Sequence, residues 1–374
     1  MDLALTESQI MLKRLTRDLL SQEFPIALVR EMEADEKGYS QELWRKMAEI
    51  GLMNIAIPEE FGGAGGDLMD LGVVLEEMGR GLYIGPFFAT VVLGSLTILY
   101  GASNTQKLGL LPLVMQGQIL LALALLEETG LYQVASVHLD AQSKGDHYIL
   151  NGTKLFVEYG HVADFFLCLA RTGPEMTDVT LFLVPGTNPG IKMTPLYTMG
   201  GDKQAEIRFD DVAVPAPNIV GKVNEGWGTI QKVLDTATAL LCMQMVGMSE
   251  KILERTTEYV KTRIQFGRPL GSFQAVQHQC ADMAINIDGA RLAAQEAVSR
   301  LTKGLPSRKE ISIAKAFCSK ACQEVTLTAH QLHGGVGFMQ EFDLQIYTRQ
   351  MEGMVLRFGT PDEHLEMLAE ELSL

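Results

Sequence analysis

This sequence is poor in positive charge. It contains 31 Lys and Arg residues against 46 Asp and Glu residues, which gives a formal net charge of -15 at pH 7. DNA and RNA are bound through basic faces that neutralise phosphates, so this balance argues against nucleic acid as a partner. An acidic chain can still bind a small anion, but it must then do so in a local basic pocket.

Metal-binding and disulfide patterns are also lacking. The five Cys residues include no CxxC pair and no Cys/His set at zinc spacing. Cys318 and Cys322 are one helical turn apart, and we expect buried, reduced thiols. His330 and His333 form an HxxH pair, but no second ligand cluster follows them, so we expect no metal site.

Long uninterrupted apolar runs are missing as well. Residues 81–106 carry no charge, but Gly, Ser, Thr, Asn and Pro86 interrupt them, and a spanning helix needs about 20 predominantly apolar residues. The first ten residues are acidic and polar, unlike a signal peptide. We therefore expect a cytoplasmic protein without a membrane partner.

What the sequence does contain is enough apolar surface for a large core. Hydrophobic residues make up 47% of the 374 residues and charged residues 21%, which is typical of a globular protein. The patterning divides the chain into three parts and predicts a mainly α protein with a central β domain. The expected parts are an N-terminal α-helical domain (1–117), a middle β domain (118–228) and a C-terminal α-helical bundle (229–374).

Periodicity supports this division. Helical patterns cover 6–20, capped by Thr6, and then 41–49, 68–80 and 86–101. Short β-like runs follow from about residue 119, with turns such as Asn151-Gly152 and no long intervening helix, so we expect an antiparallel barrel or sandwich. Apolar residues at intervals of 3 and 4 return after Trp227 and predict helices that include 273–302, 310–332 and 343–358.

Residues 259–283, YVKTRIQFGRPLGSFQAVQHQCADM, combine a helix end, a Gly/Pro turn and a new helix. Arg263 and Arg268 flank the turn, with Gln265, Phe266 and Gln274 nearby. One interpretation is a plain helical hairpin, because Arg residues are common on surfaces. The other is a seat for an anionic, aromatic cofactor, since Arg offers paired donors to phosphate oxygens.

A second segment, QLHGG at 331–335, has the same ambiguity. It can be a helix C-cap, in which a glycine ends the last turn. Alternatively, Gly334 and Gly335 would let the backbone approach a phosphate closely.

Taken in order, several motifs resemble the acyl-CoA dehydrogenase family over nearly the whole chain. They are NTQKLGLLPLVMQGQ (104–118), HYILNGTKLFV (147–157), FDDVAVP (209–215), NEGWGTI (224–230), the 259–283 stretch and QLHGGVGF (331–338). The resemblance implies an FAD cofactor and an acyl-CoA thioester substrate that loses an α-proton and a β-hydride. It also implies an electron-transfer flavoprotein as the electron acceptor.

The resemblance assigns roles to particular residues. The family positions that hold the pyrophosphate and adenine half of FAD are occupied here by Arg263, Gln265, Phe266, Gln274, Gln331, Gly334 and Gly335. In that family these groups reach across a dimer interface to the FAD of the neighbouring subunit.

The sequence also departs from the family pattern. The flavin-facing segment that resembles TEPGAGSD reads LEETGLYQ at 126–133, and the segment W-I-T or W-I-S reads Phe156-Val157-Glu158. The two positions at which the family places its catalytic Glu hold Ala237 and Phe358, so the catalytic residue is unknown. Of the nearby carboxylates, we expect Asp235 and Glu352 to be solvated or capping residues.

Three hypotheses accommodate these departures. The chain is one subunit of a heterotetrameric acyl-CoA dehydrogenase for lipid-derived or cyclic acids, and a paralogous partner subunit carries the Glu; we prefer this one. Alternatively, it is a homotetramer with a relocated base and an unusual, cyclic or bulky substrate. The third hypothesis is a flavin-free structural paralogue that stabilises a partner.

Overall fold

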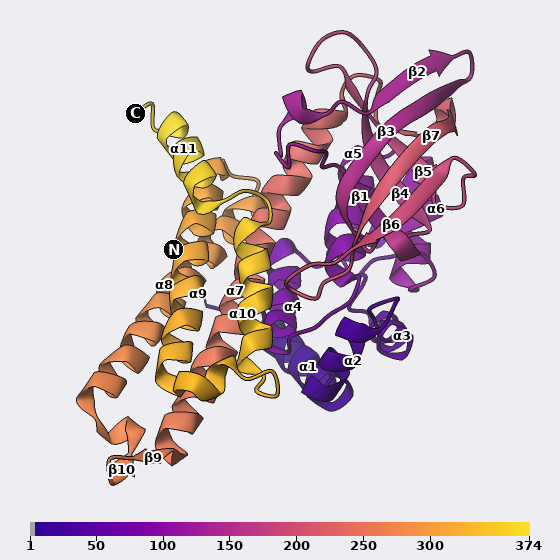
Figure 1. Cartoon of the computed structure of the whole chain (residues 1–374). Helices are drawn as coiled ribbons and strands as arrows, with labels where there is room; N and C mark the ends of the chain where they lie inside the picture. The colour runs from indigo at the N-terminus through magenta and orange to yellow at the C-terminus, as the bar shows by residue number, and fades with distance from the viewer. Residues whose placement is uncertain (1–3) are drawn as a thin grey trace.

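The computed structural model of the chain describes residues 4–374 (Figure 1). The element order is the predicted one: helices, then a β-sheet, then a bundle of longer helices. In Figure 1 the sheet lies at the upper right and the C-terminal bundle runs along the left, with the N-terminal helices packed below and between them. This arrangement confirms the predicted fold class.

The N-terminal helices begin where the sequence supplies caps. Thr6 caps α1, accepting a hydrogen bond from the Gln9 backbone N–H while the Gln9 side chain accepts one from the Thr6 N–H. Asp67 and Asp70 form the same capping box on α4, and Ser40 caps α3. The bounds are α1 Glu7–Glu23, α2 Ile26–Ala34, α3 Gln41–Glu49, α4 Leu68–Arg80, α5 Ser95–Gly101 and α6 Asn104–Met115.

The helix predicted over 86–101 is only partly regular. Phe88–Gly94 forms a π-helical segment, η2, before α5 begins. The Thr90 hydroxyl donates to the Leu121 carbonyl and accepts from the Leu121 N–H, and a Cβ on Gly94 would lie 2.5 Å from Leu121 Cβ. The widened turn therefore brings η2 against the first strand of the sheet.

The sheet has the order β6-β7-β3-β2-β4-β5-β8, and β1 pairs with β4. Most pairs are antiparallel, as predicted, but β1 runs parallel to β4, and β2 meets β4 at one parallel pair. Parallel pairing is possible here because the long segment between β1 and β4 returns the chain to the same end of the sheet. The bounds are β1 Leu121–Ala124, β2 Asp140–Lys144, β3 His147–Glu158, β4 Phe165–Arg171, β5 Val179–Pro185, β6 Ile191–Leu196, β7 Gln204–Pro215 and β8 Ile219–Val220.

The C-terminal bundle contains α7 Gly226–Thr262, α8 Gln274–Thr302, α9 Arg308–His333, α10 Leu344–Leu356 and α11 Pro361–Glu371. The predicted apolar face of α7 is buried throughout. Between α7 and α8 the chain forms a small ribbon, β9 Ile264–Gln265 and β10 Arg268–Pro269. Periodicity did not predict the short α11, which Thr360 caps and Pro361 begins.

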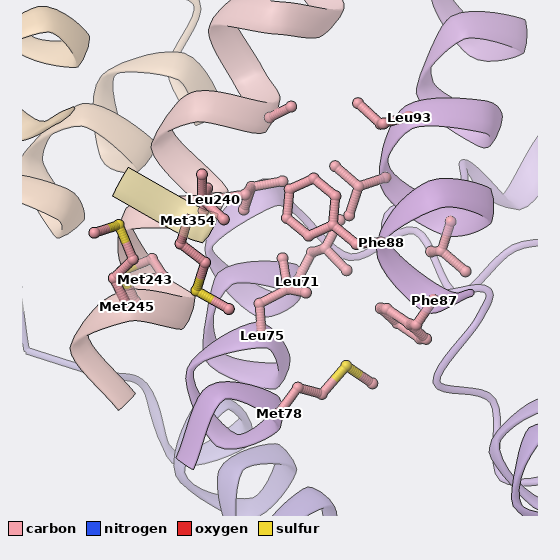
Figure 2. Close-up of a cluster of buried hydrophobic side chains, with 14 of the residues drawn as sticks. Leu71, Leu75, Met78, Phe87, Phe88, Leu93, Leu240, Met243, Met245 and Met354 are labelled. Atoms are coloured by element: carbon pink, nitrogen blue, oxygen red, sulfur yellow. The ribbon is translucent and has the colours of Figure 1, made fainter. Parts of the chain in front are cut away.

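The N-terminal helices and the C-terminal bundle share one hydrophobic core, and the sheet has a second core. Figure 2 shows Leu71 of α4, Leu240 of α7, Phe88 of η2 and Met354 of α10 meeting in the shared core. Glycines allow α4 and α7 to touch, since a Cβ on Gly247 would lie 1.8 Å from the Glu76 carbonyl oxygen. This packing places the bundle firmly against the N-terminal helices.

Across residues 4–374 no helix is long and apolar enough to cross a membrane. The same residues contain no group of three or more His, Cys, Asp or Glu side chains placed to hold a metal ion.

Candidate functional site

The β9–β10 ribbon projects from the end of the bundle that lies far from the sheet (Figure 1). Its turn residues, Phe266 and Gly267, both have positive φ, at 54° and 79°, as a type I′ hairpin turn requires. A left-handed backbone is strained for Phe, and Phe266 as a residue is 88% exposed. The turn therefore holds a largely exposed aromatic ring outward, and within this chain the ring meets Phe273 edge to face, with 6.1 Å between the ring centres.

The two arginines of the ribbon differ in their surroundings. The Arg268 guanidinium stacks 4.0 Å from the centre of the Phe273 ring. Arg263 is exposed at the end of α7, and within residues 4–374 its guanidinium has no carboxylate partner. Arg263 is thus a cation whose donors are free for an anion outside this chain.

A groove opens beside the glycine segment, close to the base of the ribbon. Its volume is about 510 Å³, within the usual range of ligand pockets, and Gln331, Gly334 and Gly335 line it. Tyr259 of α7 joins the two places, because its ring stacks 4.3 Å from His333 and its hydroxyl donates to the His333 carbonyl. The structure therefore holds the ribbon and the glycine segment together at one end of the bundle.

The glycines leave the groove open. A Cβ built on Gly334 or Gly335 would meet no atom within 4 Å, so side chains there would fill free space instead of clashing. The Phe338 ring stacks on His330 at 4.6 Å and is itself exposed. Arg349 also lines the groove, but Glu33 accepts two hydrogen bonds from it, at 2.9 and 3.1 Å.

All the residues predicted to bind the adenine half of FAD are exposed at this end of the bundle, a feature suited to a cofactor that enters from a neighbouring subunit. They are Arg263, Gln265, Phe266, Gln274, Gln331, Gly334 and Gly335.

The positions expected to face a flavin ring meet elsewhere, between the sheet and the bundle. The segment after β1, the end of β3 and the turn after α10 surround one cavity of only about 30 Å³. Its lining includes Leu126, Tyr132, Leu155, Phe156, Glu158 and Phe358. A cavity of this size holds about one water molecule.

The backbone of the altered 126–133 segment is nevertheless well supported. Glu127 accepts hydrogen bonds from the backbone N–H groups of His138 and Leu139, at 2.9–3.0 Å. The fully buried Lys154 ammonium donates to the same carboxylate at 2.7 Å and to the Leu125 carbonyl at 3.1 Å. Such a satisfied buried pair fixes the segment, so its changed side chains occupy defined places.

Glu158 is the carboxylate that lines the small cavity, and Arg357 pairs with it. Each side chain is 19% exposed. Burial raises the pKa of the Glu158 carboxyl above its ordinary value, and the Arg357 charge opposes that rise. Arg357 therefore holds charge on a carboxylate that burial alone would tend to neutralise.

Neither expected base position carries a proton acceptor. Ala237 is fully buried on α7, and Phe358 follows the end of α10. Asp235, expected to be solvated, is instead partly buried; burial raises its pKa, and it accepts a hydrogen bond from Gln231 at 2.9 Å. Glu352 accepts from Gln323 at 2.9 Å, and neither carboxylate is part of the cavity lining.

Arg357 directly precedes Phe358 in the sequence, but no motif marks it as a site residue. Phe88 and Tyr132 were not singled out, although their rings lie 5.9 and 5.7 Å from the Phe358 ring. The available signal was the opposite charge of Glu158, at an altered family position, and of Arg357, which directly precedes the altered position Phe358. Their separation of 199 positions along the chain hid the pairing.

Comparison with known proteins gives a consistent result. Family models described as the N-terminal, middle and C-terminal domains of acyl-CoA dehydrogenase match residues 6–118, 122–212 and 224–373. An acyl-CoA dehydrogenase of Bacillus subtilis is 31% identical over 363 residues, which cover 95% of each chain.

Two solved structures show the same similarity across the whole chain. Butyryl-CoA dehydrogenase from Megasphaera elsdenii has a TM-score of 0.93 at 28% identity, covering 100% of both chains. A chain of the ChsE4-ChsE5 complex from Mycobacterium tuberculosis has a TM-score of 0.91 at 29% identity, covering 100% of this chain and 99% of that one.

Proposed function

Because this chain belongs to the acyl-CoA dehydrogenase family of FAD-dependent oxidoreductases, we propose that it takes part in the α,β-dehydrogenation of an acyl-CoA thioester. We propose further that it does so as one subunit of a heteromeric enzyme. The observation that carries this proposal is the contrast between the two ends of the site: an open, exposed adenine end and a nearly closed ring end.

The adenine end fits FAD. Bound FAD supplies the acceptor for the hydride that leaves the substrate. The residues of this chain would hold the other half of the cofactor: Arg263 would donate hydrogen bonds to phosphate oxygens, and Gly334 and Gly335 would let the backbone come close to them. The exposed Phe266 ring offers an apolar contact beside these groups.

The partner must supply the catalytic base. Removal of an α-proton requires a carboxylate with a matched pKa in reach of the substrate, and Ala237 and Phe358 cannot serve. We therefore infer a paralogous acyl-CoA dehydrogenase subunit that carries a Glu at one of these two positions. The similarity to a chain solved within the ChsE4-ChsE5 complex supports such an assembly. The resemblance to the acyl-CoA dehydrogenase family also suggests that an electron-transfer flavoprotein would accept the electrons.

One observation favours a second candidate, a homomeric enzyme with a relocated base. Glu158 lines the ring-end cavity, and burial raises its pKa, which are properties of a general base. However, Arg357 pairs with this carboxylate, and an adjacent cation makes it a weaker proton acceptor. We therefore rank the heteromeric function first.

The test is FAD retention in the assembled enzyme. Arg263→Ala should strip FAD from the complex during gel filtration, because the variant lacks the free guanidinium at the adenine end. Lys261→Ala is the matched control: it removes an exposed cation from the same helix end, and FAD should remain bound. Unchanged flavin content in Arg263→Ala would show that this end of the bundle does not hold the cofactor.

A further inference from the structure

The ring-end cavity is small because side chains fill it. Tyr132 after β1 and Phe358 after α10 line the cavity, and Phe88 of η2 packs behind Phe358 as a third ring from a distant element. Phe88 stacks on Phe358 at 5.9 Å, and Tyr132 and Phe358 meet edge to face at 5.7 Å. These are the preferred geometries for packed aromatic rings, so the cluster is a well-ordered filling.

The ion pair between Arg357 and Glu158 packs against this aromatic cluster. The Arg357 guanidinium lies 4.1 Å from the centre of the Phe88 ring and 4.9 Å from that of Phe358, while it pairs with Glu158. The cation is thus held by two aromatic faces and one carboxylate. Glu158 occupies the position at which the family resemblance leads one to expect a hydroxyl beside the flavin ring.

The turn that carries Arg357 and Phe358 is anchored. The buried Lys315 ammonium donates to the carbonyls of Met354 and Val355, at 3.0 and 2.7 Å, at the end of α10. The His364 ring makes a 2.9 Å hydrogen bond with the Phe358 carbonyl. Anchors on both sides make this turn a fixed part of the structure.

The backbone at Phe358 supports the same view. Its φ of 60° is costly for a non-glycine residue, and Gly359, which follows, has a φ of 103°. A strained conformation persists only where its surroundings hold it, and here it directs a large ring into the cavity.

We propose that Glu158, Arg357, Phe88, Tyr132 and Phe358 form a plug that excludes a flavin ring from this chain's own ring site. This deepens the proposed function and rests on it: the chain then contributes only the adenine end, to a flavin seated in its partner. A flavin ring is far larger than one water molecule, so it cannot enter unless this plug is dismantled.

The plug is tested with lumiflavin, which has the flavin ring but neither ribityl chain nor phosphate nor adenine. The full chain is titrated with it, and quenching of lumiflavin fluorescence reports a buried ring. Wild type should show no saturable binding. The double variant Glu158→Thr/Phe358→Gly should bind saturably, with a Kd at least about tenfold below the highest lumiflavin concentration at which wild type shows no saturation, because it removes the pair and the central ring.

Controls keep the result specific. Phe358→Gly alone also relieves the positive-φ strain, so it gives a second folded variant, and it should gain part of the binding. Arg17→Ala breaks a different ion pair, with the buried Glu77, and should behave like wild type. Saturable lumiflavin binding by wild type, or no gain in variants that keep the native circular dichroism, would overturn the plug.

The result is independent of the partner, because the chain is measured alone with a probe that lacks the adenine half. Lumiflavin binding by wild type would overturn the plug and leave the heteromer to be tested by co-purification. Exclusion of lumiflavin from a chain that co-purifies with no paralogue would leave the plug standing and refute the heteromeric function.

Discussion

Lys315 is a fully buried cation whose ammonium donates to three neutral acceptors: the Ser319 hydroxyl and the carbonyls of Met354 and Val355. Burial lowers its pKa from 10.5 to about 8. A buried charged lysine costs stability, and the hydrogen bonds offset part of this cost. Since the same bonds fasten the end of α10, this one residue links the core to the Arg357 turn.

A pH dependence follows from that shift. Between pH 8 and 10.5 the unfolded chain binds more protons at this lysine than the folded chain does, so the free energy of unfolding rises with pH. The free energy of unfolding of wild type minus that of Lys315→Met should therefore rise with pH across this window, by up to about 1.4 kcal/mol per pH unit. Urea unfolding at several pH values measures it.

Lys320, exposed on the same helix, supplies the control. The free energy of unfolding of wild type minus that of Lys320→Met should not change over the same pH range. A flat difference for Lys315→Met as well would contradict the lowered pKa.

Single residues also show what sequence alone can yield. The two altered positions, Glu158 and Phe358, could be recognised from motif spacing, and so could the absence of a carboxylate at Ala237. That Arg357 pairs with Glu158 could not be recognised, because periodicity and motifs do not encode contacts between residues 199 positions apart. For the same reason, the contacts of the Phe88 and Tyr132 rings with Phe358 could not be predicted from the sequence.

Among the elements, the β9–β10 turn is one where a substitution should change FAD binding without lowering the stability of the chain. Phe266 has a strained backbone and is largely exposed, and its ring keeps one edge-to-face contact, with Phe273, so this chain gains little stability from it. Phe266→Asn would create an Asn-Gly turn, the pair that a type I′ hairpin favours. The free energy of unfolding should stay the same or rise by up to about 1 kcal/mol, while the assembled enzyme should retain less FAD.

Thermal unfolding of the chain and flavin content of the complex measure the two effects. Met176→Asn, which replaces another exposed apolar residue in a loop, should leave flavin content unchanged. Loss of stability in Phe266→Asn would show that the contact with Phe273 outweighs the backbone strain, and unchanged flavin content would show that the ring does not contact the cofactor.

Elements also differ in how well sequence predicts them. The ends of α3 and α4 coincide with the predicted ends, because caps and apolar periodicity are local signals. The π-helical turns of η2 and the parallel β1–β4 pair follow from contacts between η2, β1 and β4 that form only in the folded chain. Local propensity cannot report them.

On the scale of the whole molecule, one core joins the N-terminal helices to the C-terminal bundle. The β9–β10 ribbon of the adenine end projects from the end of the bundle far from the sheet (Figure 1), whereas residues after β1 and at the end of β3 line the ring-end cavity. The sequence predicted the three-part order because the apolar period changes twice along the chain. It could not predict that one end is open and the other is filled.

The most direct measurement of the central claim is the FAD content per chain, combined with the mass in solution. The account predicts that the chain purified alone is colourless, and that co-expression with its paralogous partner gives a heterotetramer with one FAD for every two chains. A yellow homotetramer of this chain alone, with one FAD per chain and activity on an acyl-CoA, would contradict it.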